Sequence, residues 1–173
     1  LLRDVELLKK EILTLGTMAE QAVREATTAI ETRDAALAQR IIDNDFKLDE
    51  MEVQVEESCL KILALYQPVA TDLRFIIAVL KINNDLERVG DLAVNVAERA
   101  AFLATQPPVG ISFDFRAMAD KAQAMLKKSL DALVNLNADL AHEVCVADDE
   151  VDELNRQMYR IVKDAIPVQP RHT

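Results

Sequence analysis

Residues 70 to 104 carry apolar side chains at alternating steps of four and three along the chain, without interruption. The members of this series are Phe75, Val79, Ile82, Leu86, Val89, Ala93, Val96, Ala100 and Leu103. The spacing follows the turn of an α-helix, so it places them along one face of a helix about 50 Å long. A helix of that length buries so narrow a face by packing along other long helices. The pattern therefore predicts a helical bundle.

The rest of the chain shows the same kind of periodicity. It predicts further helices over residues 5–31, 35–66, 114–136 and 138–166. Asp34 is placed to cap the second of these helices, and Pro68 to end it. With 3 Gly and 5 Pro in 173 residues, the chain has too few turn residues for a β-sandwich or barrel. We therefore predict an all-α fold of long antiparallel helices.

The chain also contains an internal repeat. A shift of 103 positions aligns residues 34–51 with 137–154 and matches both apolar and acidic positions. Ile41 falls on Val144, Asp45 on Asp148, Leu48 on Val151, and Asp49 on Asp152. A repeat of this length indicates two similar three-helix units in tandem. The third helix of the second unit would begin near residue 173, so we expect that unit to lack its third helix.

Gln106-Pro107-Pro108-Val109-Gly110 is the one clear linker in the sequence. It divides the chain into a first three-helix unit at 1–105, a linker at 106–112 and a partial second unit at 113–173. The two helices of the partial unit leave apolar seams uncovered, which predicts association into a homo-oligomer or a mobile second unit.

The composition excludes several classes of function. Thirty acidic residues against twenty basic ones give a net charge of −10, which argues against nucleic-acid binding. No apolar run approaches the roughly 18 residues of a membrane span, and no signal peptide is evident. We therefore expect a cytoplasmic protein. Cys59 and Cys145 both lie among apolar neighbours, and we expect both to be buried packing residues rather than a disulfide.

One polar stripe on the 70–104 helix is a candidate metal site. It consists of Asn84, Glu87, Asp91, Asn95 and Glu98, and a helical wheel places it nearly opposite the apolar series. Glu87 and Asp91 are four residues apart, so their carboxylates are neighbours and repel each other unless a cation lies between them. Carboxylate oxygens suit Mg, Ca, Mn or iron. Gly90 lies between the two acids and would allow a close approach of another group; the alternative is an ordinary solvated face.

A second acidic row, formed by Asp45, Asp49, Glu52 and Glu56, has neither Gly nor Asn beside it, and we interpret it as a solvated helix face. By contrast, Leu73, Ile77 and Leu80 make the first half of the 70–104 helix apolar on both sides. A helix that is apolar all round is covered all round. We therefore expect the second unit, another subunit or a partner protein to pack there.

Enzymatic signatures are missing from the sequence. It has no Glu-x-x-His pair, no glycine-rich phosphate loop and no arrangement of nucleophile and base. Two alternatives to a binding protein stay open at this point. One is a carboxylate–metal enzyme built in a helical bundle, and the other is a structural scaffold whose acids serve solubility only.

Two segments resemble the PhoU family of phosphate-signalling regulators. They are Pro68-Val69-Ala70-Thr71-Asp72-Leu73-Arg74 and Asn84-Asp85-Leu86-Glu87-Arg88-Val89-Gly90-Asp91. The family is built from two tandem three-helix units, each with a Glu/Asp-x-x-x-Asp motif on its third helix. The resemblance covers residues 5 to about 166 and places that motif at Glu87 and Asp91. The second motif would fall near residue 190.

The resemblance implies a negative regulator of the phosphate-starvation response rather than an enzyme. It implies an adaptor that links a phosphate ABC transporter ATPase to a sensor histidine kinase. It also implies a cytoplasmic location, with attachment to the inner face of the membrane through these partners. Glu87 and Asp91 would bind metal, as iron or another divalent cation such as Mn, Mg, Ca or Zn. Homodimers or larger assemblies are expected.

Overall fold

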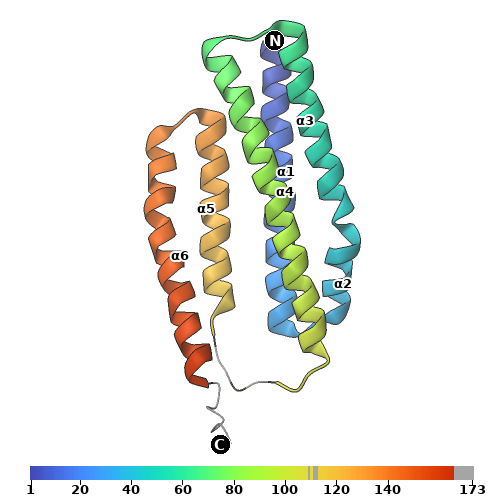
Figure 1. The fold of residues 1–173 in the computed structure, drawn as a ribbon, viewed down its shortest axis with the longest axis vertical. Helices are drawn as coiled ribbons and strands as arrows, with labels where there is room; N and C mark the ends of the chain where they lie inside the picture. The colour runs from blue at the N-terminus through green and yellow to red at the C-terminus, as the bar shows by residue number, and fades with distance from the viewer. Residues whose placement is uncertain (109, 111–112, 166–173) are drawn as a thin grey trace, which may run out of the picture.

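The computed structural model describes residues 1–108, 110 and 113–165. Every regular element in this part of the chain is an α-helix, which confirms the predicted all-α fold (Figure 1). The six helices are α1 (Leu2–Thr32), α2 (Ala35–Asn44), α3 (Phe46–Tyr66), α4 (Ala70–Ala104), α5 (Phe115–Asn135) and α6 (Ala138–Ala165). α1, α3 and α4 run side by side, and α5 and α6 form an antiparallel pair beside them.

The single helix expected over residues 35–66 is interrupted at Asp45, which separates α2 from α3. The side chain of Asn44 donates a hydrogen bond of 2.7 Å to the Arg40 carbonyl, a backbone acceptor of its own helix. The Asp45 N–H reaches only the Ile42 carbonyl, at 3.5 Å. Such a side-chain bond competes with the regular helix ladder, and Asn and Asp are weak helix formers. The expectation of one unbroken helix was wrong at this position.

The buried residues form two clusters of different character. In the first, long apolar side chains of α1, α3 and α4 pack together with Leu130 of α5; its members include Leu8, Ile12, Leu15, Val55, Ile62, Ile76, Val79 and Leu86. In the second, the buried residues are mostly alanines: Ala26, Ala29, Ala38, Ala93, Ala97 and Ala100, with Ile41. Because alanine adds so little bulk, α1, α2 and α4 approach one another closely there.

Two glycines mark the closest helix contacts. A Cβ at Gly90 would lie 2.8 Å from Cδ1 of Leu48, so the missing side chain lets α3 settle against α4. The sequence predicted a close approach at Gly90, and the approaching group is Leu48. A Cβ at Gly16 would collide with Leu130, so this second glycine forms the socket in which α5 packs on α1.

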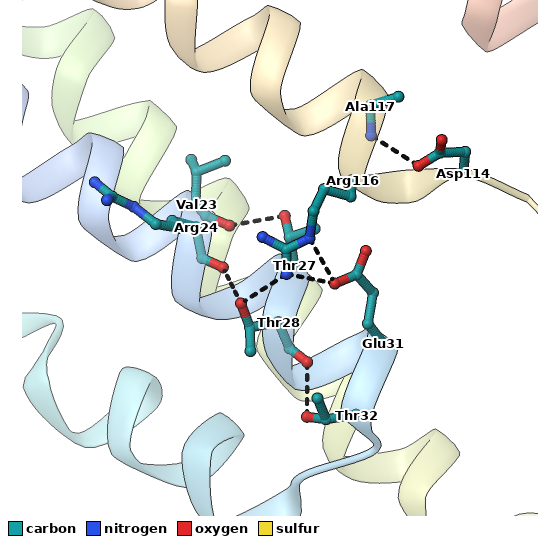
Figure 2. Close-up of polar contacts among 9 residues, drawn as sticks. All are labelled: Val23, Arg24, Thr27, Thr28, Glu31, Thr32, Asp114, Arg116 and Ala117. Carbon is teal, nitrogen blue, oxygen red and sulfur yellow. Dashed lines mark hydrogen bonds and ion pairs between the residues drawn. The ribbon is translucent and has the colours of Figure 1, made fainter.

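Polar contacts also tie α5 to α1 (Figure 2). Arg116 Nε and Nη2 donate to Oε2 of Glu31 at 3.0 and 2.5 Å, and Nη2 also reaches Thr28 Oγ1 at 3.3 Å. Asp114 caps α5 by accepting from the Ala117 N–H at 2.9 Å. The side chain of Arg33 donates to the carbonyls of Leu103 and Gln106, which fixes the end of α4 beside the α1–α2 turn.

A cavity of about 530 Å³ is lined by residues of α1, α4, α5 and α6. Its α5 residues are Phe115, Met118, Ala119 and Ala122. With the 103-residue shift these correspond to Ile12, Leu15, Gly16 and Ala19, which are all buried in the first unit. The cavity therefore lies on the face of α5 that is equivalent to the buried face of α1.

α6 is the one helix of the six described that has no buried residue, whereas α4 has nine. It packs against α5. Cys145, which we expected to be buried, is therefore exposed. Cys59 is buried as expected, and burial raises the pKa of its thiol to about 12.

This difference predicts a gradient of local stability. Amide hydrogens in α6 are expected to exchange with solvent much faster than those in the centre of α4, because opening α6 exposes little apolar surface. Hydrogen exchange followed by mass spectrometry measures this directly. Equal protection of the two helices would contradict it.

Candidate functional site

The structure brings the two acidic rows of the sequence together. Glu87 and Asp91 project from α4 beside the face of α3 that carries the second row. Partial burial raises the pKa of Glu87, and neighbouring carboxylates raise it further. Those neighbours are Asp91 on α4, with Asp49 and Asp45 across the helix–helix boundary. The row that we interpreted as an ordinary solvated face is therefore part of one acidic face shared by α3 and α4.

The charges of the α4 carboxylates also affect the acids of the second row. Partial burial raises the pKa of Asp45, and the charges of Asp49 and Asp91 add to the effect. Burial likewise raises the pKa of Glu52, with added contributions from Glu56, Glu87 and Asp49. None of these carboxylates forms an ion pair with a basic group in the described part of the chain. Negative charge is concentrated here without internal compensation.

The position of the stripe on α4 differs from the prediction. The buried residues of α4 include Ile76, Asn83, Gly90 and Ala97, which lie outside the apolar series, while Val96 and Leu103 of that series are 36% and 37% exposed. The buried face is therefore turned towards α3. Glu87 and Asp91 flank this face instead of pointing away from it, because α4 packs against α1, α2 and α3 together.

Asn83 is a residue of this site that the sequence reasoning missed. Its side chain is fully buried, and Nδ2 donates to the Glu52 carbonyl at 3.0 Å and to Glu52 Oε1 at 2.8 Å. These bonds join α4 to α3 directly behind the acidic face. The sequence could have indicated its burial, because Asn83 lies four residues after Val79 and three before Leu86. This spacing places a polar side chain at a core position, where it needs a hydrogen-bond partner.

Together, Gly90 and Asn83 set the spacing of the acidic face. Gly90 admits Leu48, and Asn83 holds the backbone and side chain of Glu52. The acids at Asp45 and Asp49 thus lie within electrostatic range of Glu87 and Asp91. Of the four, Asp49 and Asp91 are exposed, whereas Asp45 and Glu87 are half-buried.

The chemistry of this donor set fits a hard divalent cation, since every candidate ligand is a carboxylate without a basic partner. The side chains do not form a closed cage as they stand: within residues 1–108, 110 and 113–165, no three acidic, His or Cys side chains converge closely enough to hold one metal ion. Binding would require rotamer changes of these surface acids. Asn84, Asn95 and Glu98 continue the stripe on α4 and are exposed.

The second unit repeats part of the arrangement. Asp148 and Asp152 of α6 occupy the positions of Asp45 and Asp49, and Asp152 lines the cavity. Unlike its counterpart, Asp152 has a basic partner, because Arg156 Nη2 lies 3.5 Å from its Oδ2. No second helix with acids equivalent to Glu87 and Asp91 faces it in the described structure.

These features define a protein of tandem helical units with a concentrated acidic face. The PhoU domain matches the chain over residues 12–100 and 115–172, and the chain belongs to the PhoU family. The two matched segments confirm the tandem organisation. Family members named in the comparisons are accessory and regulatory proteins, so the chain falls in a non-enzymatic family and the carboxylate–metal enzyme alternative is not supported.

Individual relatives agree with this assignment. The phosphate-specific transport system accessory protein PhoU homolog of Aquifex aeolicus is 35% identical over 172 residues, which is 99% of this chain and 78% of the relative. The homolog from Clostridium acetobutylicum is 39% identical over 90% of this chain and 72% of its own.

Solved structures show the same fold. The crystal structure of PhoU from Pseudomonas aeruginosa superposes with a TM-score of 0.83 at 36% identity, covering 91% of this chain and 76% of that one. That of the phosphate transport system regulatory protein PhoU from Streptococcus pneumoniae gives 0.80 at 26% identity, over 92% and 77%. Among the helices of the described residues, none combines the length and the apolar character that a membrane span requires.

Proposed function

We propose that this protein is a cytoplasmic accessory regulator of phosphate uptake and a negative regulator of the phosphate-starvation response. In this role it is an adaptor between a phosphate ABC transporter ATPase and a sensor histidine kinase. The observation that carries the proposal is the match of both units to the PhoU domain, with relatives named as accessory proteins of phosphate-specific transport.

Affinity capture from a cell extract tests the adaptor role. The expected result is recovery of the transporter ATPase or the sensor kinase with the tagged chain, and identification of each by mass spectrometry. A capture that reproducibly contains neither protein, from cells in which both are expressed, would contradict the adaptor proposal.

We further propose that Glu87 and Asp91 bind a metal, either as iron or as another divalent cation such as Mn, Mg, Ca or Zn. The arrangement described above adds Asp45 and Asp49 as partners across the helix boundary. What supports this is the clustering of carboxylates without ion-pair partners: partial burial, and then the neighbouring negative charges, raise the pKa values of Asp45 and Glu87. A bound cation would remove that repulsion, and the helices would supply only the oxygen ligands.

The raised pKa values give the metal affinity a defined dependence on pH. Because the pKa values of Asp45 and Glu87 lie above their ordinary values, protons compete with metal at a higher pH than for isolated carboxylates. Mn²⁺ affinity is expected to fall with decreasing pH before the ordinary carboxylate range is reached. Calorimetric titration at a series of pH values measures this, and an affinity that declines only within the ordinary range would contradict it.

Metal binding needs these carboxyl groups ionised, whereas folding of the metal-free protein is favoured by their protonated form. A carboxyl whose folded pKa is raised favours the folded state while protonated, and this contribution is lost as pH rises through the folded pKa. Glu87→Gln should therefore stabilise the metal-free protein at neutral pH and have little effect in acid. Thermal unfolding at both pH values, in the presence of a chelator, checks the sign.

We also propose that the chain is organised into units at 1–105 and 113–173, and that it forms a homo-oligomer. We propose that the apolar cavity between α1, α4, α5 and α6 is covered by association of chains, because it is large and α6 has no buried residue. Light scattering should give a mass above that of one chain, and Met118→Glu, which places a charge in the cavity wall, should lower it. A mass of one chain for the unmodified protein would contradict this.

A further inference from the structure

The connection between α3 and α4 exposes a group of apolar side chains at one end of the molecule. We call this group the apolar corner: Leu65, Tyr66, Val69 and Leu73, which are 63%, 43%, 76% and 38% exposed. Figure 1 places the connection at one extreme of the long axis, beside the N-terminus. The corner includes part of the Pro68–Arg74 segment, which takes no part in the acidic face.

The corner is held in a fixed shape. Pro68 is buried beneath it, and the Tyr66 hydroxyl donates to Asp4 Oδ2 at 2.8 Å. Gln67 and Ala70 adopt left-handed backbone conformations, with φ of 43° and 51°. Such conformations are unfavourable for residues with a side chain, so the surrounding packing must impose them. The exposure of Val69 between these two residues is thus a property of an ordered turn.

The exposed charges at the corner that have no ion-pair partner are basic, although the chain carries a net charge of −10. In residues 1–6 and 61–74 the basic residues are Arg3, Lys61 and Arg74, and the acidic ones are Asp4, Glu6 and Asp72. Asp4 accepts the Tyr66 hydroxyl, Glu6 pairs with Lys9, and Asp72 is half-buried. Lys61 and Arg74 are exposed beside the corner, and neither forms an ion pair with another described residue. This end of the molecule is therefore complementary to an anionic surface.

The rest of the described chain leaves the corner uncovered. The sequence predicted a cover for the apolar first half of α4 and named the second unit as one candidate. α5 packs on α1 and α6 packs on α5, so the second unit does not supply it. Ile77, one turn beyond Leu73, is likewise 40% exposed.

We infer that the apolar corner docks in the headgroup region of an anionic lipid bilayer. A helix of a partner protein calls for a groove, but the corner lies at a helix–turn–helix tip. From Val69 to Leu73 is about 6 Å along α4, a depth that suits insertion of apolar side chains at the boundary between headgroups and acyl chains. Lys61 and Arg74 then lie at the level of the lipid phosphates, where each adds to the attraction.

Co-sedimentation with lipid vesicles tests the inference on the full chain. Vesicles of phosphatidylglycerol and phosphatidylethanolamine in equal parts should bind the protein, and phosphatidylcholine vesicles should not. Binding should weaken as salt is added, because the lipid charge is screened. Arg74→Gln should weaken binding roughly fivefold, and Val69→Asp roughly tenfold or more.

The variants are chosen to separate docking from folding. Val69 precedes the first residue of α4, where Asp is a favourable cap, so Val69→Asp should retain the helical spectrum and unfolding temperature. Phe102→Asp is the matched control, since Phe102 is 59% exposed at the opposite end of α4. It should bind vesicles as the unmodified protein does.

Several results would overturn the inference. They are no sedimentation with anionic vesicles, equal binding to neutral vesicles, or an equal loss with Phe102→Asp. A fourth is self-association, without lipid, that Val69→Asp abolishes, because a second copy of the chain would then be the cover of the corner.

Discussion

Leu86→Ala is expected to destabilise the protein by about 2–5 kcal/mol. Leu86 is 1% exposed, and its side chain belongs to the main cluster of apolar residues formed by α1, α3 and α4 with Leu130 of α5. Removing it leaves a hole that rigid neighbouring helices cannot close, so the loss includes the transfer free energy and the cost of the cavity. Urea unfolding followed by circular dichroism gives the difference in unfolding free energy.

The matched control for this change is Leu60→Ala. Leu60 lies on the neighbouring helix α3 and is 53% exposed, so its truncation should alter the unfolding free energy by no more than about 0.5 kcal/mol. A denaturation midpoint that Leu86→Ala leaves unmoved would show that the central face of α4 does not carry the core. Equal losses for the two variants would contradict the burial difference between them.

The periodic apolar series was sufficient to predict the fold class, because a helix as long as α4 has few ways to bury one face. It was less accurate about which face is buried. Asn83, Gly90 and Ala97 are buried although none belongs to the series, since small or hydrogen-bonded residues sit where helices approach most closely. The sequence pattern counts apolar side chains, whereas helix packing also selects for small ones.

The acidic face shows a different limit. Spacing within one helix predicts that Glu87 and Asp91 are neighbours, but it does not say which other helix lies beside them. That depends on a tertiary contact, the packing of Leu48 on Gly90, which brings Asp45 and Asp49 across. Gly90 indicated a close approach, and only the structure identifies the partner. Cys145 was misassigned for a related reason: its apolar neighbours predict burial, but among the described helices α6 packs mainly against α5, and Cys145 is exposed.

Replacing both Glu87 by Gln and Asp91 by Asn is expected to abolish specific Mn²⁺ or Fe²⁺ binding, with the helical spectrum retained. Both side chains lie at the protein surface and make no ion pair in the described structure, so their loss removes ligands and not packing. Without metal, the double variant should be as stable as the unmodified protein or more so, because repulsion is relieved. With metal, it should lack the thermal stabilisation that a bound ion gives.

Asp45→Asn belongs to the same test. The sequence alone would make Asp45 the control, on a row interpreted as solvated, and predict unchanged metal binding. Its charge interaction with Asp91 reverses that expectation: the change should weaken Mn²⁺ binding, because in the proposed site Asp45 would supply charge and a ligand from the opposite side of the helix boundary. Asp49→Asn should act in the same direction.

Glu57→Gln replaces Asp45→Asn as the control. Glu57 is an exposed acid of α3 that contributes to none of the raised pKa values of the acidic face, so its loss changes net charge equally without touching the cluster. Calorimetric titration should give unmodified affinity for Glu57→Gln. If all variants bind Mn²⁺ and Fe²⁺ with the affinity of the unmodified protein, the acids of α3 and α4 form an ordinary solvated face. If Glu57→Gln weakens binding as much as Asp91→Asn, the attraction comes from the overall charge of the protein and not from a site.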